Sequence, residues 1–259
     1  MRILLTNDDG IHAPGLAALV SQFEGLGQLH VVAPATHQSG ASHGISVSEP
    51  LRARRVRVHG LWDGWAVSGR PADCVKLGLA ELLGFRPDVV VSGINDGANV
   101  GVNVLYSGTV AAAAQAALFG IPSVALSLQW SGKMDFASVG RHAAGWLPGA
   151  LERGISPGVV MNLNYPAGYC GDRLELRLVR QSTACPPDLY EARRDPFGNV
   201  YYWSASGDLK GCTHDADTDV AALAAGCITL CPLRFDVTDH PELSRLARAC
   251  AFGVSHPAG

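Results

Sequence analysis

The sequence predicts an α/β protein whose central sheet is built from parallel strands. Short apolar runs that leave no room for a helix recur along the chain, at residues 3–5, 87–94 and 121–128. Segments with apolar residues at helical spacing lie between them, the first at residues 15–23. With 259 residues and 47% hydrophobic content, the chain suffices for one large domain or two smaller ones with a sizeable core.

The first strand ends in two adjacent carboxylates, Asp8 and Asp9. Gly10 permits a sharp turn and Pro14 suits the first turn of a helix, which places the pair on a strand-to-helix loop. Such loops lie at the carboxyl edge of the sheet, where open α/β folds bind ligands. Adjacent carboxylates keep both charges only beside a cation or a well-hydrated surface. The pair is therefore either a site for a hard divalent metal or an Asp-Asp turn in solvent.

The second predicted strand, residues 29–33, leads into a polar, glycine-bearing loop at residues 35–44. A loop of this length more often marks function than a simple connection. Ser39 is its candidate metal ligand, because a hydroxyl oxygen can complete the shell of a hard cation; a turn serine is the ordinary alternative. His37 and His43 flank it, as phosphate donors or as exposed loop histidines.

Residues 45–69 alternate as strands do, first at Ile45 and Val47 and later at residues 56–58 and 65–67. Four arginines lie along this segment, either as a solvated strand face or with one of them reaching a phosphate. These are Arg52, Arg54, Arg55 and Arg57. Pro71 then begins a predicted helix that ends at Leu83.

The strand at residues 87–94 opens the second informative stretch. Glycines follow at positions 93, 97 and 101 and asparagines at positions 95, 99 and 103, a spacing that suits neither a helix nor a strand. Glycine lets the backbone turn its amides toward a ligand, and asparagine offers both an acceptor and a donor. A metal and a phosphate can therefore share this loop.

The loop ends at Ser107, Gly108 and Thr109, where an alanine-rich helix begins and continues to Leu118. A helix N-terminus has unpaired amides and partial positive charge, so it binds phosphate without a basic residue. Ser107 is a plain helix cap or a cap whose hydroxyl also faces the ligand.

Up to residue 166 the chain continues to alternate predicted apolar strands and helices. Beyond residue 166 the sequence instead predicts β-hairpins that project from the core. The aromatic residues Tyr201, Tyr202 and Trp203 belong to these hairpins. The further predicted elements are strands at residues 121–128, 158–164, 174–179 and 227–233, and helices at residues 136–151, 218–226 and 241–249.

The composition excludes several partners. A net charge of −3 gives no general reason to bind a nucleic-acid polymer or an anionic membrane, and no apolar run is long enough to span a bilayer. Seven cysteines without paired spacing indicate reduced thiols and a cytoplasmic protein. Cys227 and Cys231 fit one face of a strand as small apolar residues better than a zinc site.

Three motifs give the chain a resemblance to a known family. NDDG at residues 7–10, SGINDGANVG at 92–101 and YSGTVAAA at 106–113 resemble the SurE family of metal-dependent nucleotidases, and similar stretches cover nearly the whole chain. The resemblance implies a Rossmann-like three-layer α/β/α sandwich with a mostly parallel sheet. Residues 1–166 would form the catalytic core. Residues 167–259 would supply a β-hairpin and a C-terminal helix exchanged between the subunits of a homodimer or homotetramer.

The resemblance also implies an activity and the residues that perform it. The activity is hydrolysis of nucleoside 5′- and 3′-monophosphates, with some action on short polyphosphate, using one Mg²⁺ or Mn²⁺ per subunit. The implied metal ligands are Asp8, Asp9, Ser39 and Asn95, and the implied phosphate-binding residues are Asn99, Ser107, Gly108 and Thr109. Our hypothesis makes Asp8, Asp9 and Asn95 catalytic through this metal, with Asp9 positioning or deprotonating the attacking water.

Three positions depart from the family pattern. Asn103 and Gln115 stand where family members commonly carry Asp and Glu, and Arg70 stands where they carry Thr. The two lost charges motivate one alternative, a catalytically weakened nucleotide-binding paralogue. A second alternative is a receiver-like, Mg²⁺-binding regulatory domain, which would need a phospho-accepting Asp where Asn95 stands.

Overall fold

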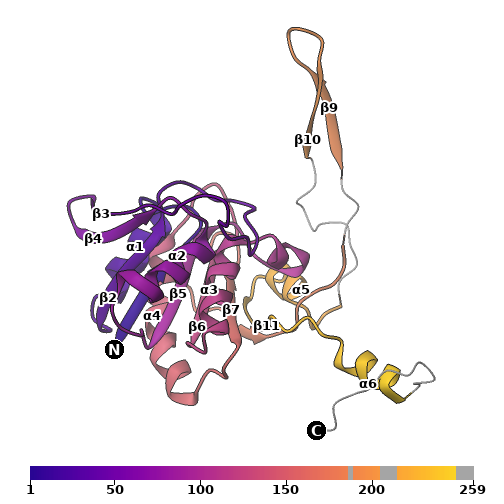
Figure 1. The fold of residues 1–259 in the computed structure, drawn as a ribbon. Helices are drawn as coiled ribbons and strands as arrows, with labels where there is room; N and C mark the ends of the chain where they lie inside the picture. Colours follow the sequence, from indigo (N-terminus) through magenta and orange to yellow (C-terminus); the bar gives the residue numbers. More distant parts are fainter. Residues whose placement is uncertain (186–188, 205–214, 249–259) are drawn as a thin grey trace.

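A computed structural model describes residues 1–185, 189–204 and 215–248 and confirms the α/β fold with a mostly parallel sheet (Figure 1). Nine strands form one sheet in the order β3-β4-β2-β1-β5-β6-β7-β11-β8. Only the β3–β4 and β7–β11 pairs of this described sheet are antiparallel. The strands are β1 (Arg2–Thr6), β2 (Gln28–Pro34), β3 (Ala53–Val58), β4 (Trp62–Val67), β5 (Val89–Asp96), β6 (Ser123–Leu128), β7 (Val159–Tyr165), β8 (Leu176–Leu178) and β11 (Ile228–Arg234).

Helices α1 (Pro14–Phe23) and α4 (Phe136–Arg153) cover one face of the sheet, and α2 (Pro71–Leu77) and α3 (Gly108–Leu118) cover the other. α5 (Asp219–Ala224) packs against β11, whereas none of the residues of α6 (His240–Arg248) is buried. Strand alternation sends Ile3 and Leu5 into the core that α1 and α4 complete, while Leu4 joins the opposite core beneath α2 and α3. The sequences of the core strands are therefore continuous apolar runs, because each strand is buried on both faces.

The parallel core strands bring distant segments together at one edge. β1 lies between β2 and β5, with Leu5 opposite Val31 on one side and Val91 on the other. Because these strands run in the same direction, the loops that leave their carboxyl ends meet at the same edge of the sheet. Asp8, Asp9 and Ser39 lie on those loops, and Asn95 lies at the end of β5.

Two predicted elements differ in the structure. Residues 45–47, within the described part of the chain, form no strand, because the Ser46 amide donates to the Asp73 carboxylate instead of to a neighbouring strand. The predicted helix at residues 71–83 is α2 followed by a π-helical segment, Gly78–Leu82. Its apolar residues still pack against the sheet core.

The C-terminal part combines sheet strands with exposed elements. β8 and β11 belong to the central sheet, whereas β9 (Tyr190–Arg194) and β10 (Val200–Ser204) form a separate hairpin that projects away from it (Figure 1). Every residue of these two strands is exposed. Residue 249, the predicted end of the last helix, lies outside the described residues. Within the described residues, the helices are too short or too polar to cross a membrane.

Candidate active site

The loop after β1 is fixed by its own hydrogen bonds. The Asn7 side chain donates to the Gly10 carbonyl over 2.9 Å and accepts from the Gly10 amide over 3.2 Å. Gly10 has a φ of +100°, a conformation that side-chain-bearing residues rarely adopt. This closed turn presents Asp8 and Asp9 at the edge of the sheet.

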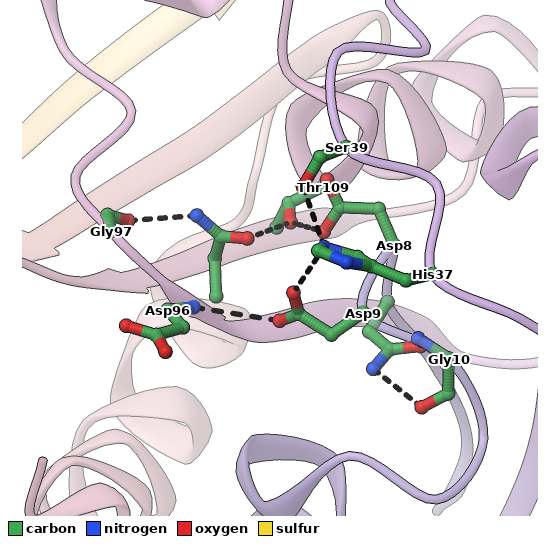
Figure 2. Close-up of polar contacts among 10 residues, drawn as sticks. Asp8, Asp9, Gly10, His37, Ser39, Asp96, Gly97 and Thr109 are labelled. Atoms are coloured by element: carbon green, nitrogen blue, oxygen red, sulfur yellow. Dashed lines mark hydrogen bonds and ion pairs between the residues drawn. The ribbon is translucent and has the colours of Figure 1, made fainter. Parts of the chain in front are cut away.

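Asp8 lies at the centre of the site and is 4% exposed. Its carboxylate accepts a short hydrogen bond from the hydroxyl of Thr109, in the first turn of α3 (Figure 2). The same hydroxyl lies 3.3 Å from Oδ1 of Asn95 at the end of β5. Asn95 is oriented by its Nδ2 group, which donates to the Gly97 carbonyl over 2.8 Å. Asp8, Thr109 and Asn95 therefore form one connected group.

Asp9 connects the site to the loop after β2. Its Oδ1 lies 3.2 Å from His37 Nε2, and that nitrogen lies 2.5 Å from the hydroxyl of Ser39 (Figure 2). Its Oδ2 accepts from the Asp96 amide over 3.4 Å. The structure thus brings together the four predicted metal ligands from the loops after β1 and β2 and from the end of β5.

The electrostatics of the pair favour a cation. Burial raises the pKa of Asp8 above its usual range, because the Thr109 hydrogen bond offsets the loss of solvent only in part. Burial and the neighbouring charge of Asp8 raise the pKa of Asp9 to about 6. Among the described residues, neither carboxylate pairs with a lysine or arginine, and the His37 side chain near Asp9 is 60% exposed. The two charges therefore lack a strong protein counterion.

The donor set fits a hard divalent ion. Asp8, Asp9, Ser39 and Asn95 offer carboxylate, hydroxyl and amide oxygens, which Mg²⁺ and similar ions prefer over nitrogen or sulfur. In the part of the chain that the structure describes, no group of three or more His, Cys, Asp and Glu residues is arranged to hold a metal. A metal ion at this position would be held by two carboxylates supplemented by neutral oxygens.

The N-terminus of α3 directly adjoins this cluster. Ser107 caps the helix, and its hydroxyl accepts from the Val110 amide over 3.1 Å. A β-carbon on Gly108 would lie 2.8 Å from the Asp8 β-carbon, so only glycine allows this close approach. The first turn of a helix leaves backbone N–H groups available to an anion. Phosphate can therefore bind beside the carboxylates without a lysine or arginine.

Asn99 occupies a different environment from the other predicted residues. It is 7% exposed, its Nδ2 donates to the Ser127 hydroxyl over 2.8 Å, and its backbone amide donates to Asn164 over 2.7 Å. Asn162 and Asn164 both donate to its carbonyl, over 2.9 and 3.2 Å. In the structure Asn99 anchors the loop to β6 and β7, and its contact with phosphate stays a prediction.

Two contributions could not be identified from the sequence. The Thr109 side chain, assigned to phosphate, holds Asp8 and Asn95 in place. Asp219, at the start of α5, is fully buried and accepts from the Gly101 amide over 2.9 Å and the Ser182 amide over 2.8 Å. It fixes the loop that leads to α3. Asp219 follows Gly101 by 118 positions, so no local pattern indicates this contact.

The departures from the family pattern lie around the site. Oε1 of Gln115 lies 3.1 Å from Nε2 of His43, which brings the loop after β2 against α3. Asn103 lies in a 3₁₀ turn, Gly101–Leu105, between the asparagine-rich loop and α3. Arg70 is exposed and precedes α2.

Comparison with known proteins agrees with this geometry. The family model described as Survival protein SurE matches residues 3–185. The chain belongs to the SurE family. Its relatives include proteins named 5′-nucleotidase SurE from Rhodopirellula baltica and Nitratidesulfovibrio vulgaris. The first is 47% identical over 95% of this chain and 97% of the relative, and the second is 45% identical over 100% and 96%.

A solved SurE structure has the same fold. The crystal structure of the SurE protein from Aquifex aeolicus matches with a TM-score of 0.82 and 31% identity, covering 96% of this chain and 99% of that one. The family resemblance read from the three motifs is thereby confirmed.

Proposed function

We propose that this SurE-family protein is a metal-dependent 5′-nucleotidase that hydrolyses nucleoside monophosphates to a nucleoside and phosphate. The observation that carries the proposal is the contact between Asp8 and the start of α3, which places two uncompensated carboxylates beside an anion-binding helix terminus. The names of the relatives that are 47% and 45% identical support the same activity.

Each residue has a defined role in this proposal. Asp8, Asp9, Ser39 and Asn95 would hold one Mg²⁺ or Mn²⁺, which supplies Lewis acidity and a lowered water pKa when bound. The Thr109 hydroxyl fixes Asp8 and Asn95 relative to each other. The amides of Gly108 and Thr109 bind the phosphate oxygens and stabilise their growing charge. Asp9 orients the attacking water and accepts its proton. The proton is then transferred to the leaving oxygen of the nucleoside.

The proposed range of substrates includes other terminal phosphates. The residues just described contact only the phosphoryl group, so they accept a 3′-monophosphate or the end of a short polyphosphate as readily as a 5′-monophosphate. Selectivity among these substrates must come from groups outside the phosphate site.

Metal removal tests the proposed function. We expect purified protein with Mn²⁺ to release phosphate from adenosine 5′-monophosphate, and EDTA to lower the rate by about a hundredfold or more, with recovery when Mn²⁺ is added in excess. Release that continues unchanged in EDTA would contradict metal dependence. Nucleotide binding without release under any metal condition would instead indicate the catalytically silent paralogue.

We also propose that the protein is a homodimer or homotetramer in which the C-terminal elements pack on another subunit. The hairpin leaves Tyr202 67% and Trp203 59% exposed, and each residue of α6 is at least partly exposed in the single chain. Aromatic side chains in such numbers are typical of protein interfaces. Sedimentation equilibrium should give the mass of two or four 27.1 kDa chains. A monomer at micromolar concentration would refute this assembly.

A further inference from the structure

A polar pocket lies beside the candidate phosphate site. Its volume is about 400 Å³, within the range of small-molecule sites. Its polar lining consists of Gln38, Ser46, Ser48, Glu49, Ser68 and Arg70. Ile45 and Val47 also line it, and these two apolar side chains are 38% and 83% exposed. The pocket therefore offers hydrogen-bonding groups together with apolar surface, as a flat heterocyclic ligand requires.

Two contacts connect this pocket to the phosphate site. Gln38 lies between His37 and Ser39 on the loop after β2, and its backbone amide donates to the Asp8 carbonyl over 2.8 Å. Arg70 directly precedes Pro71, whose Cγ would lie 3.0 Å from a β-carbon on Gly108. A ligand whose phosphate binds at the start of α3 can therefore extend into the pocket.

The pocket wall is held in place without a ligand. Asp73 is 2% exposed and accepts from the Ser46 amide over 3.0 Å and from the Ser46 hydroxyl over 2.8 Å. It also accepts from the Arg70 backbone amide over 3.0 Å. These bonds tie the irregular segment around Ser46 to the start of α2. Such a preformed wall lowers the ordering cost of binding.

Arg70 and Glu49 supply opposite hydrogen-bonding groups to one pocket. Both residues line the pocket and are exposed. Arginine donates and never accepts, whereas an ionised glutamate accepts and never donates. A base that matches both must therefore present acceptors to the arginine and donors to the carboxylate.

We infer that this pocket binds the nucleoside half of the substrate and selects guanine, an inference that rests on the proposed nucleotidase function. Guanine presents the acceptors O6 and N7, which an arginine can contact together, and N–H donors that suit a carboxylate. Adenine places an amino donor where guanine has O6, so it faces the Arg70 guanidinium with like polarity. Pyrimidines lack N7 altogether.

The test compares guanosine and adenosine 5′-monophosphates with p-nitrophenyl phosphate, which has no nucleoside. With Mn²⁺, the unmodified protein should show a kcat/KM for the guanine nucleotide about tenfold or more above that for the adenine nucleotide. Arg70→Gln should lower the ratio of guanine nucleotide to p-nitrophenyl phosphate turnover by about tenfold or more, and Glu49→Gln should lower it in the same direction. Arg54→Gln, an exposed position on β3 outside the pocket, is the matched control and should leave the ratio unchanged.

The outcomes separate the two proposals. Turnover of p-nitrophenyl phosphate without guanine preference, or with a ratio unaffected by Arg70→Gln, would overturn the inference and leave the nucleotidase proposal standing. If no substrate is hydrolysed, the proposed function fails. Whether the pocket holds guanine is then tested separately, by calorimetric measurement of guanosine monophosphate binding. Weaker binding to Arg70→Gln than to Arg54→Gln would support the inference, and equal binding would overturn it. The Arg70 backbone bond to Asp73 persists in the variant, so α2 keeps its first turn.

Discussion

Asp8→Asn should lower kcat/KM for a nucleoside monophosphate by about a hundredfold or more, because it removes one of two carboxylate charges at a site whose other donors are neutral. The same substitution should leave the metal-free protein as stable as before, or more so. Burial raises the pKa of Asp8, so its ionised form is less favourable in the folded chain than in the unfolded chain at neutral pH. Activity and stability should therefore change in opposite directions.

The measurement for Asp8→Asn combines phosphate release with thermal unfolding. Mn²⁺ should raise the Tm of the unmodified protein and change that of the variant much less. Asp63→Asn is the matched control, because Asp63 pairs with Arg57 on the surface of the β3–β4 hairpin and lies outside the site. Full metal-dependent turnover by Asp8→Asn would show that the ion is held elsewhere.

Gly108→Ala should lower kcat/KM by about a hundredfold while leaving the fold intact. The added β-carbon would lie 2.8 Å from the Asp8 β-carbon and 2.9 Å from its Oδ2, so the start of α3 and the carboxylate must separate. Gly108 is the first residue of a helix, where alanine is favourable in itself. The expected loss is therefore one of geometry at the phosphate site.

Steady-state kinetics and urea unfolding distinguish this effect from general destabilisation. Gly145→Ala in α4 serves as the control, because a β-carbon there meets no atom within 4 Å. Both variants should unfold cooperatively, and only Gly108→Ala should lose activity. Turnover by Gly108→Ala equal to that of Gly145→Ala would mean that the contact between α3 and Asp8 has no part in the reaction.

Much of the sheet could be predicted because its strands are buried on both faces. The runs around Leu4 and Val90 leave few alternatives to a parallel core strand. Ile45 and Val47 show the limit of the same pattern. They alternate like a strand, but Asp73, 27 positions after Ser46, takes the Ser46 amide that a strand partner would need. Local periodicity carries no information about such a distant acceptor.

The candidate site shows the same difference between what a local pattern predicts and what distant contacts determine. Asp8, Asp9 and Asn95 could be selected because acidic and amide side chains follow buried strands, and the parallel sheet brings them together. The link from Asp8 to Thr109 spans 101 positions and depends on how α3 packs against β5 and β6. Asn99 was predicted to bind phosphate because it lies in the asparagine-rich loop. Its hydrogen bonds to Ser127 and Asn164, on neighbouring strands, determine where it lies. Composition and spacing predict which residues gather, whereas packing determines what each one contacts.

The most direct test of the proposed metal centre is an anomalous difference map from crystals of the protein grown with Mn²⁺. Our assignment predicts one strong peak per chain, within coordination distance of oxygens from Asp8, Asp9, Ser39 and Asn95 and next to the first turn of α3. A manganese peak at another position, with these four side chains unligated, would contradict it.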